Sequence, residues 1–405
     1  MPVNLKLIPT AAMRPNQPKW WVWLLLLLAG LLGGTAYAIL SSSTKPEINA
    51  ETFWGTALAL PALSWLTLLV LRMAWYKGNQ AMANGWNKDR EKTIQRETER
   101  GRRFLQVLGV SLHSALREPD DTNGQLQLNA LQEKTQSLKT QASWLSDEGI
   151  RHSRLFRLDN ETPEQLLARG LNKTLEELSL VLASVPADVS LALLVESNSC
   201  LSDSQIQAIW QQSWADSHIR QPVTRIEGSG LATLDQWLDQ GINKKSLLLV
   251  VALQVAPEQP EGTAEAVVGL LLGNAWAQTE LKSLASLHRP EQAHDMGTQD
   301  LHYAMGQSLD WVPVSAEAVT SGWLVGVDAT YHGAIATGLK ALSSPINIGQ
   351  DLHDLGSTLG YPGPAAPWLA IACATGASKP QLIMSGDGLS NTPLWATIVM
   401  PSLTS

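Results

Sequence analysis

Cysteine and histidine are the side chains of this sequence with the strongest nucleophilic and acid–base chemistry. A cysteine thiolate attacks acyl carbons near neutral pH, and an imidazole both donates to a developing oxyanion and titrates in the same range. The chain has two cysteines, Cys200 and Cys373, without paired spacing, so neither a disulfide framework nor a zinc site is predicted. Cys200 follows the strand-like run LALLVESNS, whereas Cys373 lies in the apolar LAIACATG and is predicted to be a small core residue.

The other chemistry-bearing residues form no recognisable ligand or catalytic set. His288, His294 and His302 fall in a polar stretch that we expect to be a loop, and their spacing matches no standard metal-ligand pattern. Asp387, in SGDG, is predicted to be a turn former. The sequence has no G-x-S-x-G elbow, G-x-x-x-x-G-K loop or H-E-x-x-H pair. We therefore expect no catalytic residues, no bound metal and no cofactor.

A glycine-rich turn near the end of the chain carries the most specific pattern. LGSTLGYPGPA runs from Leu355 to Ala365 and precedes an apolar helix predicted over Trp368–Ala374. The sequence LIMSGDGLSNTPLWATIV then predicts a strand, a glycine loop and a last strand, with Gly386, Gly388 and Asn391 in the loop. From about Asp188 to Pro401 this layout resembles the β-ketoacyl synthases of the thiolase-like superfamily.

The resemblance implies a cleft where those enzymes use a cysteine at a strand-to-helix elbow and two histidines that stabilise an enolate oxygen. Ser357 stands where the family has its second histidine, and a hydroxyl is a poorer donor to a developing negative charge. His332, in YHGAIATG, is a surface or loop residue by our prediction, and lies closer to Ser357 than the family's first histidine would. His353 precedes Ser357 by four residues, and Cys200 falls too near the start of the domain. The resemblance therefore implies a catalytically silent relative.

The elements that would position these residues are strands with continuous apolar runs. Such runs, without alternation, are typical of strands buried on both faces by helices, which predicts an α/β fold. They are Val189–Ser197, Ser246–Val255, Ala264–Asn274 and Ser321–Ala329, followed by the terminal hairpin. A helix with a serine cap is predicted over Ser202–Ser213, and another is predicted to start near Ser229. The fold class we expect is a layered thiolase-like α/β domain.

Two uncharged runs precede this domain, Trp20–Leu40 and Phe53–Leu71, each close to the ~20 residues that a membrane-spanning helix needs. We expect a transmembrane hairpin in residues 1–76, with spans of about 20–40 and 53–75. The many Lys and Arg residues after the second span predict that both ends face the cytoplasm. A cleaved signal peptide ending near Ala36–Ala38 is the alternative for the first run. The net charge of −8 excludes a nucleic-acid partner of the usual basic kind.

The segment between the membrane and the domain is predicted to be a mainly helical stalk, residues 77–185. An apolar stripe at helical spacing begins at Phe104. It comprises Phe104, Leu105, Leu108, Leu112 and Leu116. Further helices are predicted over Gln125–Leu145 and Pro163–Leu182. The thiolase-like domain is then expected to occupy residues 186–405.

These features predict a non-enzymatic scaffold or accessory protein of the bacterial inner membrane. The layout resembles accessory proteins encoded with type VI secretion machinery, and we expect contacts with the lipid bilayer, protein partners and a homodimer. The alternative is a membrane-tethered acyltransferase or ketosynthase-like enzyme that uses Cys200 with His332 and His353. A toxin-related or immunity protein is permitted by the hairpin, but no residue supports it specifically.

Overall fold

The computed structural model describes residues 3–44, 49–241, 244–274, 277, 281–294, 297–389 and 392–402. The chain divides into two compact units, one over Asn4–Glu97 and one that contains Thr98–Ser405. Asn391, which the sequence places in the last glycine loop, lies outside the described residues.

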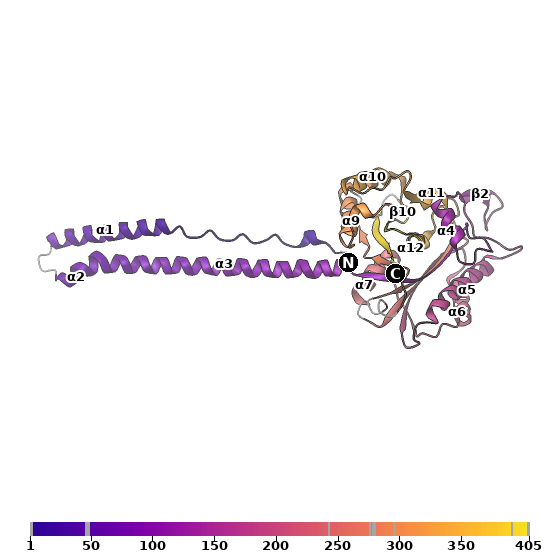
Figure 1. Cartoon of the computed structure of the whole chain (residues 1–405), viewed down its shortest axis with the longest axis horizontal. Coiled ribbons are helices and arrows are strands. Elements are labelled where there is room, and N and C mark those ends of the chain that lie inside the picture. The colour runs from indigo at the N-terminus through magenta and orange to yellow at the C-terminus, as the bar shows by residue number, and fades with distance from the viewer. Residues whose placement is uncertain are drawn as a thin grey trace. The chain divides into compact units, whose positions relative to one another are not determined.

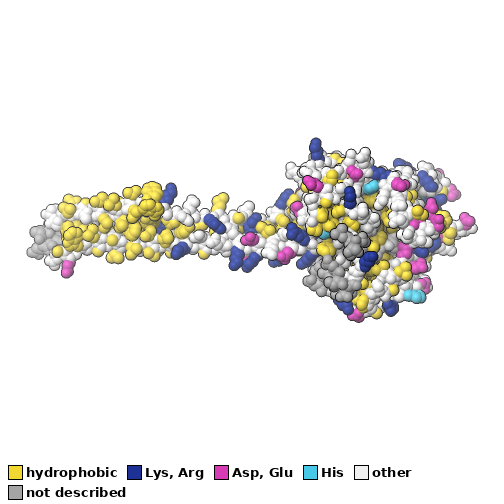
Figure 2. All heavy atoms as spheres, viewed as in Figure 1, with side chains coloured by type: hydrophobic (Ala, Val, Ile, Leu, Met, Phe, Trp, Pro, Cys, Tyr) yellow, Lys and Arg dark blue, Asp and Glu magenta, His cyan; other side chains and the backbone are white. Residues whose placement is uncertain are grey.

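The Asn4–Glu97 unit is helical and apolar. Its elements are η1 (Leu5–Leu7), α1 (Trp20–Thr44), α2 (Ala50–Trp54), the π-helical η2 (Gly55–Ala59) and α3 (Leu60–Gly101), which continues beyond the unit. Two helical stretches, Trp20–Ser43 and Ala50–Gly101, are long and apolar enough to cross a membrane. Figure 2 shows hydrophobic side chains over much of their surface. This agrees with the expected pair of spans.

The two apolar helices pack closely where small residues meet Pro61. A Cβ atom on Gly34 would lie 2.5 Å from the Cγ atom of Pro61 and 2.7 Å from the carbonyl oxygen of Ala57, so only glycine fits there. Farther along, the indole N–H of Trp65 donates to the carbonyl oxygen of Trp23 at 2.7 Å. The π-helical turn, which ends two residues before Pro61, is a local adjustment of the kind that accommodates a missing backbone donor.

In its described residues, the unit that contains Thr98–Ser405 is built on one hydrogen-bonded sheet of eleven strands. Its strands are β1 (Phe104–His113), β4 (Ser190–Asn198), β5 (Val223–Arg225), β6 (Ser246–Gln254), β7 (Ala266–Gly273), β8 (Ala285–His288), β9 (Glu291–Gln292), β10 (Ser321–Val325), β11 (Leu352–Asp354), β12 (Gln381–Ser385) and β13 (Trp395–Pro401). A separate hairpin pairs β2 (Lys139–Ala142) with β3 (Gly149–His152). The main helices are α4 (Gln125–Gln132), α5 (Pro163–Leu182), α6 (Asp203–Asp216), α7 (Gly230–Gln240), α9 (Thr298–Asp310), α10 (His332–Ala341), α11 (Leu355–Thr358) and α12 (Ala366–Thr375). Short 3-10 turns are η3 (Ala316–Ala318), η4 (Ala329–Tyr331) and η5 (Gly363–Ala365).

The strand order shows an internal duplication. The first half runs β5-β4-β6-β7-β1 and the second runs β11-β10-β12-β13-β8, so each half has its strands in the order third, second, fourth, fifth, first. In both halves the second strand pairs in parallel with the third and fourth, and the fifth pairs antiparallel with the fourth and first. The two first strands, β1 and β8, join the halves. In each half, the chain leaves the third strand toward a central helix, α7 or α12.

Alternate side chains of a strand point to opposite faces of the sheet and pack in different hydrophobic cores, so the unit is layered. In β6, Leu247, Leu249 and Val251 face the outer cluster with α5. Leu248 and Val250 of the same strand face the central cluster with α7 and α12. In the second half, residues of β12 and β13 likewise contribute to an outer cluster with α9 and α10. Figure 1 shows α5 and α6 together, and α9 and α10 together, away from α12. The sequence prediction of strands buried on both faces by helices is confirmed.

The segment from Phe104 to His113 corrects the predicted stalk, because it is strand β1 in the middle of the sheet. Two of its non-apolar positions, Gly109 and Ser111, lie where α5 approaches. A Cβ on Gly109 would lie 3.2 Å from Leu178 of α5, and Ser111 donates to Glu177 at 2.6 Å. Strand β1 is buried on both faces, but these two residues interrupt its apolar run. The remaining apolar residues therefore have a spacing that resembles that of a helix.

The rest of the predicted stalk also belongs to the α/β unit. Helix α5 matches the predicted Pro163–Leu182, but only Gln125–Gln132 of the next predicted helix is α-helical, and the β2–β3 hairpin follows it. The compact α/β unit therefore includes the chain from Thr98, and the expected start at residue 186 is wrong. A long helix is present, but it is α3, which ends at Gly101.

A buried ion cluster joins α7 to the start of the second half. The side chain of Arg289, which is fully buried, donates to Asp235 at 2.6 Å and to Asp239 at 2.5 Å. Arg100, in the last turn of α3, donates to both carboxylate oxygens of Asp239 at 3.0 Å, and Arg103 donates to it at 3.1 Å. Burial alone would raise the pKa of Asp239, but the hydrogen bonds from Arg100 and Arg289 outweigh it and lower that pKa to about 2.

Glu291, beside this cluster, is a buried acid whose pKa is raised, unlike that of Asp239. Glu291 is 2% exposed, and its carboxyl group accepts a hydrogen bond from the indole N–H of Trp311 at 2.6 Å. Burial, with a smaller contribution from Asp235, raises the pKa of Glu291 to about 7. The folded carboxyl therefore stays protonated in a range where the unfolded chain, with a pKa near 4.5, is ionised.

Replacing Glu291 by glutamine should therefore change how stability depends on pH. Between about pH 4.5 and 7 the folded protein binds more protons than the unfolded chain at this position, so ionisation of Glu291 lowers stability as the pH rises. We expect the free energy of unfolding of Glu291→Gln, relative to wild type, to increase over this range by up to about 3 kcal/mol. Urea unfolding of the full-length protein in detergent at several pH values measures it. The exposed Glu317→Gln is the matched control, and parallel curves for Glu291→Gln and wild type would contradict the assignment.

Candidate functional site

A cavity of about 530 Å³ opens where the two halves of the α/β unit meet. Ends of strands β4 and β12 and the N-terminal ends of helices α7 and α12 contribute to its wall. Clefts at such switch points, outside the carboxyl ends of parallel strands, are common ligand sites in α/β sheets. The described residues that line it are Glu196, Ser229, Gly230, Leu231, Ala232, Gln292, Tyr361, Gly363, Pro364, Pro367, Ser385, Gly386, Asp387, Thr392, Pro393 and Trp395.

Glu196 lines this cavity and connects both central helices. It follows Ala192 and Leu194 on the face of β4 that packs against α7 and α12. Its Oε1 atom accepts the backbone N–H of Gly230, in the first turn of α7, and the indole N–H of Trp368 on α12, each at 3.0 Å. Burial raises the pKa of Glu196, although these two hydrogen bonds oppose the shift. The carboxylate thus satisfies one orphan donor of the α7 N-terminus.

The turn before α12 is held against the sheet by Gln254 at the end of β6. Its side-chain amide donates to the carbonyl oxygens of Tyr361 at 2.8 Å and Ala264 at 2.9 Å, and its Oε1 accepts from Asn198 at 2.8 Å. Gly363 has a φ of 54°, and a Cβ there would overlap Gln254 Oε1. The glycine is therefore required by a close approach in the cavity wall, and no catalytic role is needed to explain it.

The loop after β12 adds a second carboxylate. Asp387 accepts the backbone N–H of Leu389 at 3.0 Å and the hydroxyl of Thr392, which confirms the prediction of a turn former. Burial raises the pKa of Tyr361 to about 12, and the negative charges of Asp387 and Glu196 add to that shift. Both carboxyl groups therefore disfavour ionisation of the Tyr361 phenol.

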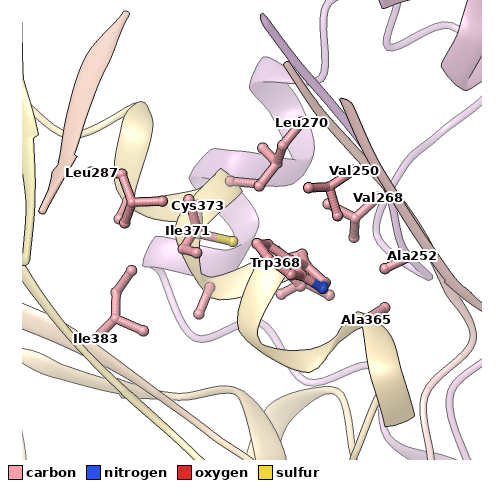
Figure 3. Packing of buried hydrophobic residues seen from close by; sticks show 14 of the residues in the cluster. Val250, Ala252, Val268, Leu270, Leu287, Ala365, Trp368, Ile371, Cys373 and Ile383 are labelled. Atoms are coloured by element: carbon pink, nitrogen blue, oxygen red, sulfur yellow. The ribbon is translucent and has the colours of Figure 1, made fainter. Parts of the chain in front are cut away.

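The two cysteines lie away from this cavity. Cys200 comes after the end of β4 and packs with the outer cluster beside α5 and α6, where its backbone N–H donates to the carbonyl oxygen of Ala256 at 2.8 Å. Burial raises the pKa of the Cys200 thiol. Cys373 is fully buried in α12, as Figure 3 shows among Trp368, Leu270 and other apolar side chains, and burial strongly raises its pKa. The prediction that Cys373 is a core residue is confirmed.

The imidazoles and the serine of the glycine-rich turn are also outside the cavity lining. His332 is the first residue of α10, and the ring of His353, in β11, stacks on Trp323 with 4.5 Å between centroids. Burial and the nearby Lys134 lower the pKa of His353. Ser357 is exposed in α11, where its hydroxyl donates to the carbonyl oxygen of Asp354 at 2.9 Å. Ser357 thus completes a local turn.

The expected polar loop is wrong for His288 and His302, whereas His294 is exposed in a bend between β9 and α9. His288 ends strand β8 and is 3% exposed, and burial lowers its pKa to about 4. His302 lies in helix α9, close to the carbonyl oxygen of Ala334 at 3.1 Å. The apolar residues of α9 that face the outer core explain why this polar stretch is ordered. In the described parts of the chain, no group of three or more His, Cys, Asp or Glu side chains is placed to hold a metal ion.

Comparison with solved structures identifies the fold. The chain is similar to a protein described as "PfaC Keto synthase-Chain length factor", with a TM-score of 0.52 and 12% identity over 74% of this chain and 43% of that one. It is also similar to a structure of a type II PKS acyl-carrier protein in complex with its ketosynthase, with a TM-score of 0.50 and 10% identity over 74% and 99% of the two chains. The α/β unit therefore has a thiolase-like fold. The human mitochondrial 3-ketoacyl-CoA thiolase has a TM-score of 0.45 and 9% identity over 75% and 100% of the chains.

Comparison at the level of sequence adds no family assignment. No family model matches the chain, and no curated protein matches it. The chain spans less than half the length of the first of the structures named above. At these identities the likeness extends to the fold alone, and a fold by itself does not define a chemistry.

Sequence reasoning missed Glu196 and Tyr361 as residues of the site. One signal was present, because Glu196 is a single acidic residue in the apolar run Val189–Ser197, and a buried acid in a strand needs partners. Ser229, which the sequence predicts near the start of a helix, is the N-cap of α7 at the cavity wall, without a side-chain capping hydrogen bond. Tyr361 follows Gly360 in the glycine-rich turn, and no local pattern there marks a tyrosine as a residue of a site.

Proposed function

We propose that this chain is a membrane-anchored scaffold or accessory protein whose thiolase-fold domain recognises partners and does not catalyse acyl condensation. One observation carries the proposal. The described residues that line the cavity at the N-termini of α7 and α12 include neither cysteine nor histidine. Their hydroxyl, carboxyl and phenol groups therefore include no thiol to be acylated and no imidazole to act as its base.

The positions of the thiols and imidazoles support the same proposal. Cys200 packs on the outer face of the first half, whereas His332 and His353 belong to α10 and β11 in the second half. Nucleophile and base must lie within hydrogen-bond reach for nucleophilic catalysis. The alternative, an acyltransferase or ketosynthase-like enzyme using Cys200, therefore has less support.

The anchor determines where we expect the protein to work. We propose a bacterial inner-membrane location with two spans and both termini in the cytoplasm, because basic residues follow the second apolar run. They are Arg72, Lys77, Lys88, Arg90, Lys92, Arg96, Arg100, Arg102 and Arg103. Since the layout resembles accessory proteins encoded with type VI secretion machinery, components of such a machine are the first partners to seek by affinity purification in mild detergent. A homodimer is part of this proposal, and light scattering in detergent tests it.

A thiol-labelling experiment tests the absence of acyl chemistry. The full-length protein in detergent is incubated with a cysteine-directed acyl analogue, beside an active ketosynthase as positive control and the denatured protein as a control for thiol content. We expect the native protein to remain unlabelled at both cysteines, because burial raises the pKa of each thiol. Cys200→Ser should leave the cellular function unchanged. Stoichiometric native labelling that is lost in Cys200→Ser would establish the enzyme alternative.

A further inference from the structure

The cavity has charged side chains of one sign. Among the described residues that line it are two carboxyl groups, those of Glu196 and Asp387, and no Lys, Arg or His. Both carboxylates act on the same phenol, because each raises the pKa of Tyr361. An apolar substrate or an anion would leave these two carboxylates without an opposite charge, whereas a cation would give them one.

The helix N-termini at the cavity are the main opposing feature, because helix dipoles favour anions there. At the N-terminus of α7, the carboxyl group of Glu196 already occupies the place of an anion, because it accepts the backbone N–H of Gly230. At the start of α12, two of the residues that face the cavity are Pro364 and Pro367, which have no backbone N–H to offer an anion. None of these three lining residues therefore offers a free backbone N–H to an anion, whereas two carboxyl groups line the cavity.

Glu196 also has acceptor capacity left for a ligand. Both hydrogen bonds that it receives from the described residues end on Oε1, and its second oxygen, Oε2, has acceptor positions available in a residue that lines the cavity. The rings of Tyr361 and Trp395 belong to the same wall. Aromatic faces beside carboxylates attract organic cations through their quadrupole, in addition to the direct charge attraction.

We propose that this cavity binds an organic cation, an ammonium or a guanidinium, between the carboxylates of Glu196 and Asp387 and the rings of Tyr361 and Trp395. The cation comes from a Lys or Arg side chain of a partner protein or from a free amine. A volume of about 530 Å³ accommodates a whole long side chain and its neighbouring backbone. The inference deepens the proposed function and rests on it, since it treats the cavity as a recognition site.

Calorimetric titration of the full-length protein in detergent tests the site. The probes are N-acetyl-lysine methylamide, its uncharged norleucine analogue and spermidine, with succinate as the anionic probe. We expect a cationic probe to bind, the norleucine analogue and succinate not to bind, and the affinity to fall as salt is added. Tighter binding of the lysine probe than of spermidine assigns the site to a partner side chain, and the reverse order assigns it to a free amine.

Charge-removing variants identify the carboxylates. Asp387→Asn keeps an acceptor for its exposed turn, and Glu196→Gln keeps an acceptor for Gly230 and Trp368, so both are expected to fold. We expect the double variant to lose at least about tenfold in affinity. Glu258→Gln, which removes an exposed charge outside the cavity lining, should stay within about twofold of wild type.

The proposal is overturned if no cationic probe binds, if the double variant binds as wild type does, or if succinate is the ligand that binds. These outcomes are separate from the labelling experiment. Labelling of Cys200 with intact cation binding would reject the non-catalytic function and keep the site. If the protein is not labelled and no cation binds, the proposed cation site is wrong and the non-catalytic function still stands.

Discussion

Replacing Arg289 by methionine should destabilise the α/β unit by about 3–5 kcal/mol, because it removes the guanidinium that neutralises two carboxylates in and beside the core. The guanidinium is fully buried and holds Asp235, whose side chain is 3% exposed, and Asp239 through separate nitrogens. Methionine replaces most of the volume of the arginine side chain. The loss of stability therefore reports mainly the removed charge interaction and only to a small extent a new cavity. Urea unfolding of the full-length protein, followed by tryptophan fluorescence, gives the change in free energy of unfolding.

The exposed Arg220→Met is the matched control and should change stability by less than about 0.5 kcal/mol. A loss below about 1 kcal/mol in Arg289→Met would mean that the two aspartates find other partners or become protonated at little cost. Arg100 and Arg103 would be such partners for Asp239.

Replacing Trp368 by alanine should cost about 3–5 kcal/mol, because it opens a cavity at the centre of the layered core. Trp368 is fully buried on α12 among residues of β6 and β7, as Figure 3 shows. The same change removes the indole N–H that donates to Glu196, which loses one of its two hydrogen bonds. Thermal or urea unfolding of the full-length protein measures the loss.

Trp368→Phe separates the two contributions. It keeps most of the ring volume and removes the indole N–H, so we expect a smaller loss of about 1–3 kcal/mol. Leu389→Ala, on an exposed side chain of the loop after β12, serves as the surface control. Equal losses for the alanine and phenylalanine variants would contradict the expected cavity term.

Much of the α/β unit followed from local patterns. The continuous apolar runs predicted β4, β6, β7 and β10, and the terminal hairpin is present as β12 and β13. The Ser202 cap predicted α6, whose capping box is present. These predictions hold because strands buried on two faces and capped helices depend on residues that are close in sequence.

The strand β1 and the duplication could not be obtained in this way. Gly109 and Ser111 are small or polar because α5 packs on them, and that requirement exists only in the folded protein. The repeated strand order is likewise a property of pairing between distant segments, and β1 joins β8 although the two strands are far apart along the chain.

The sequence by itself determined the chemistry that the chain has available: two cysteines, a serine at position 357, a glycine-rich turn and two runs apolar enough to span a membrane. Only the tertiary structure decided which of these groups meet. It brings Glu196, Tyr361 and Asp387 to one cavity from β4, the turn before α12 and the loop after β12, and it leaves Cys200 on another face of the sheet. The physical reason is that side-chain direction alternates along a strand, so the pairing of the strands determines which face, and therefore which neighbours, each residue has.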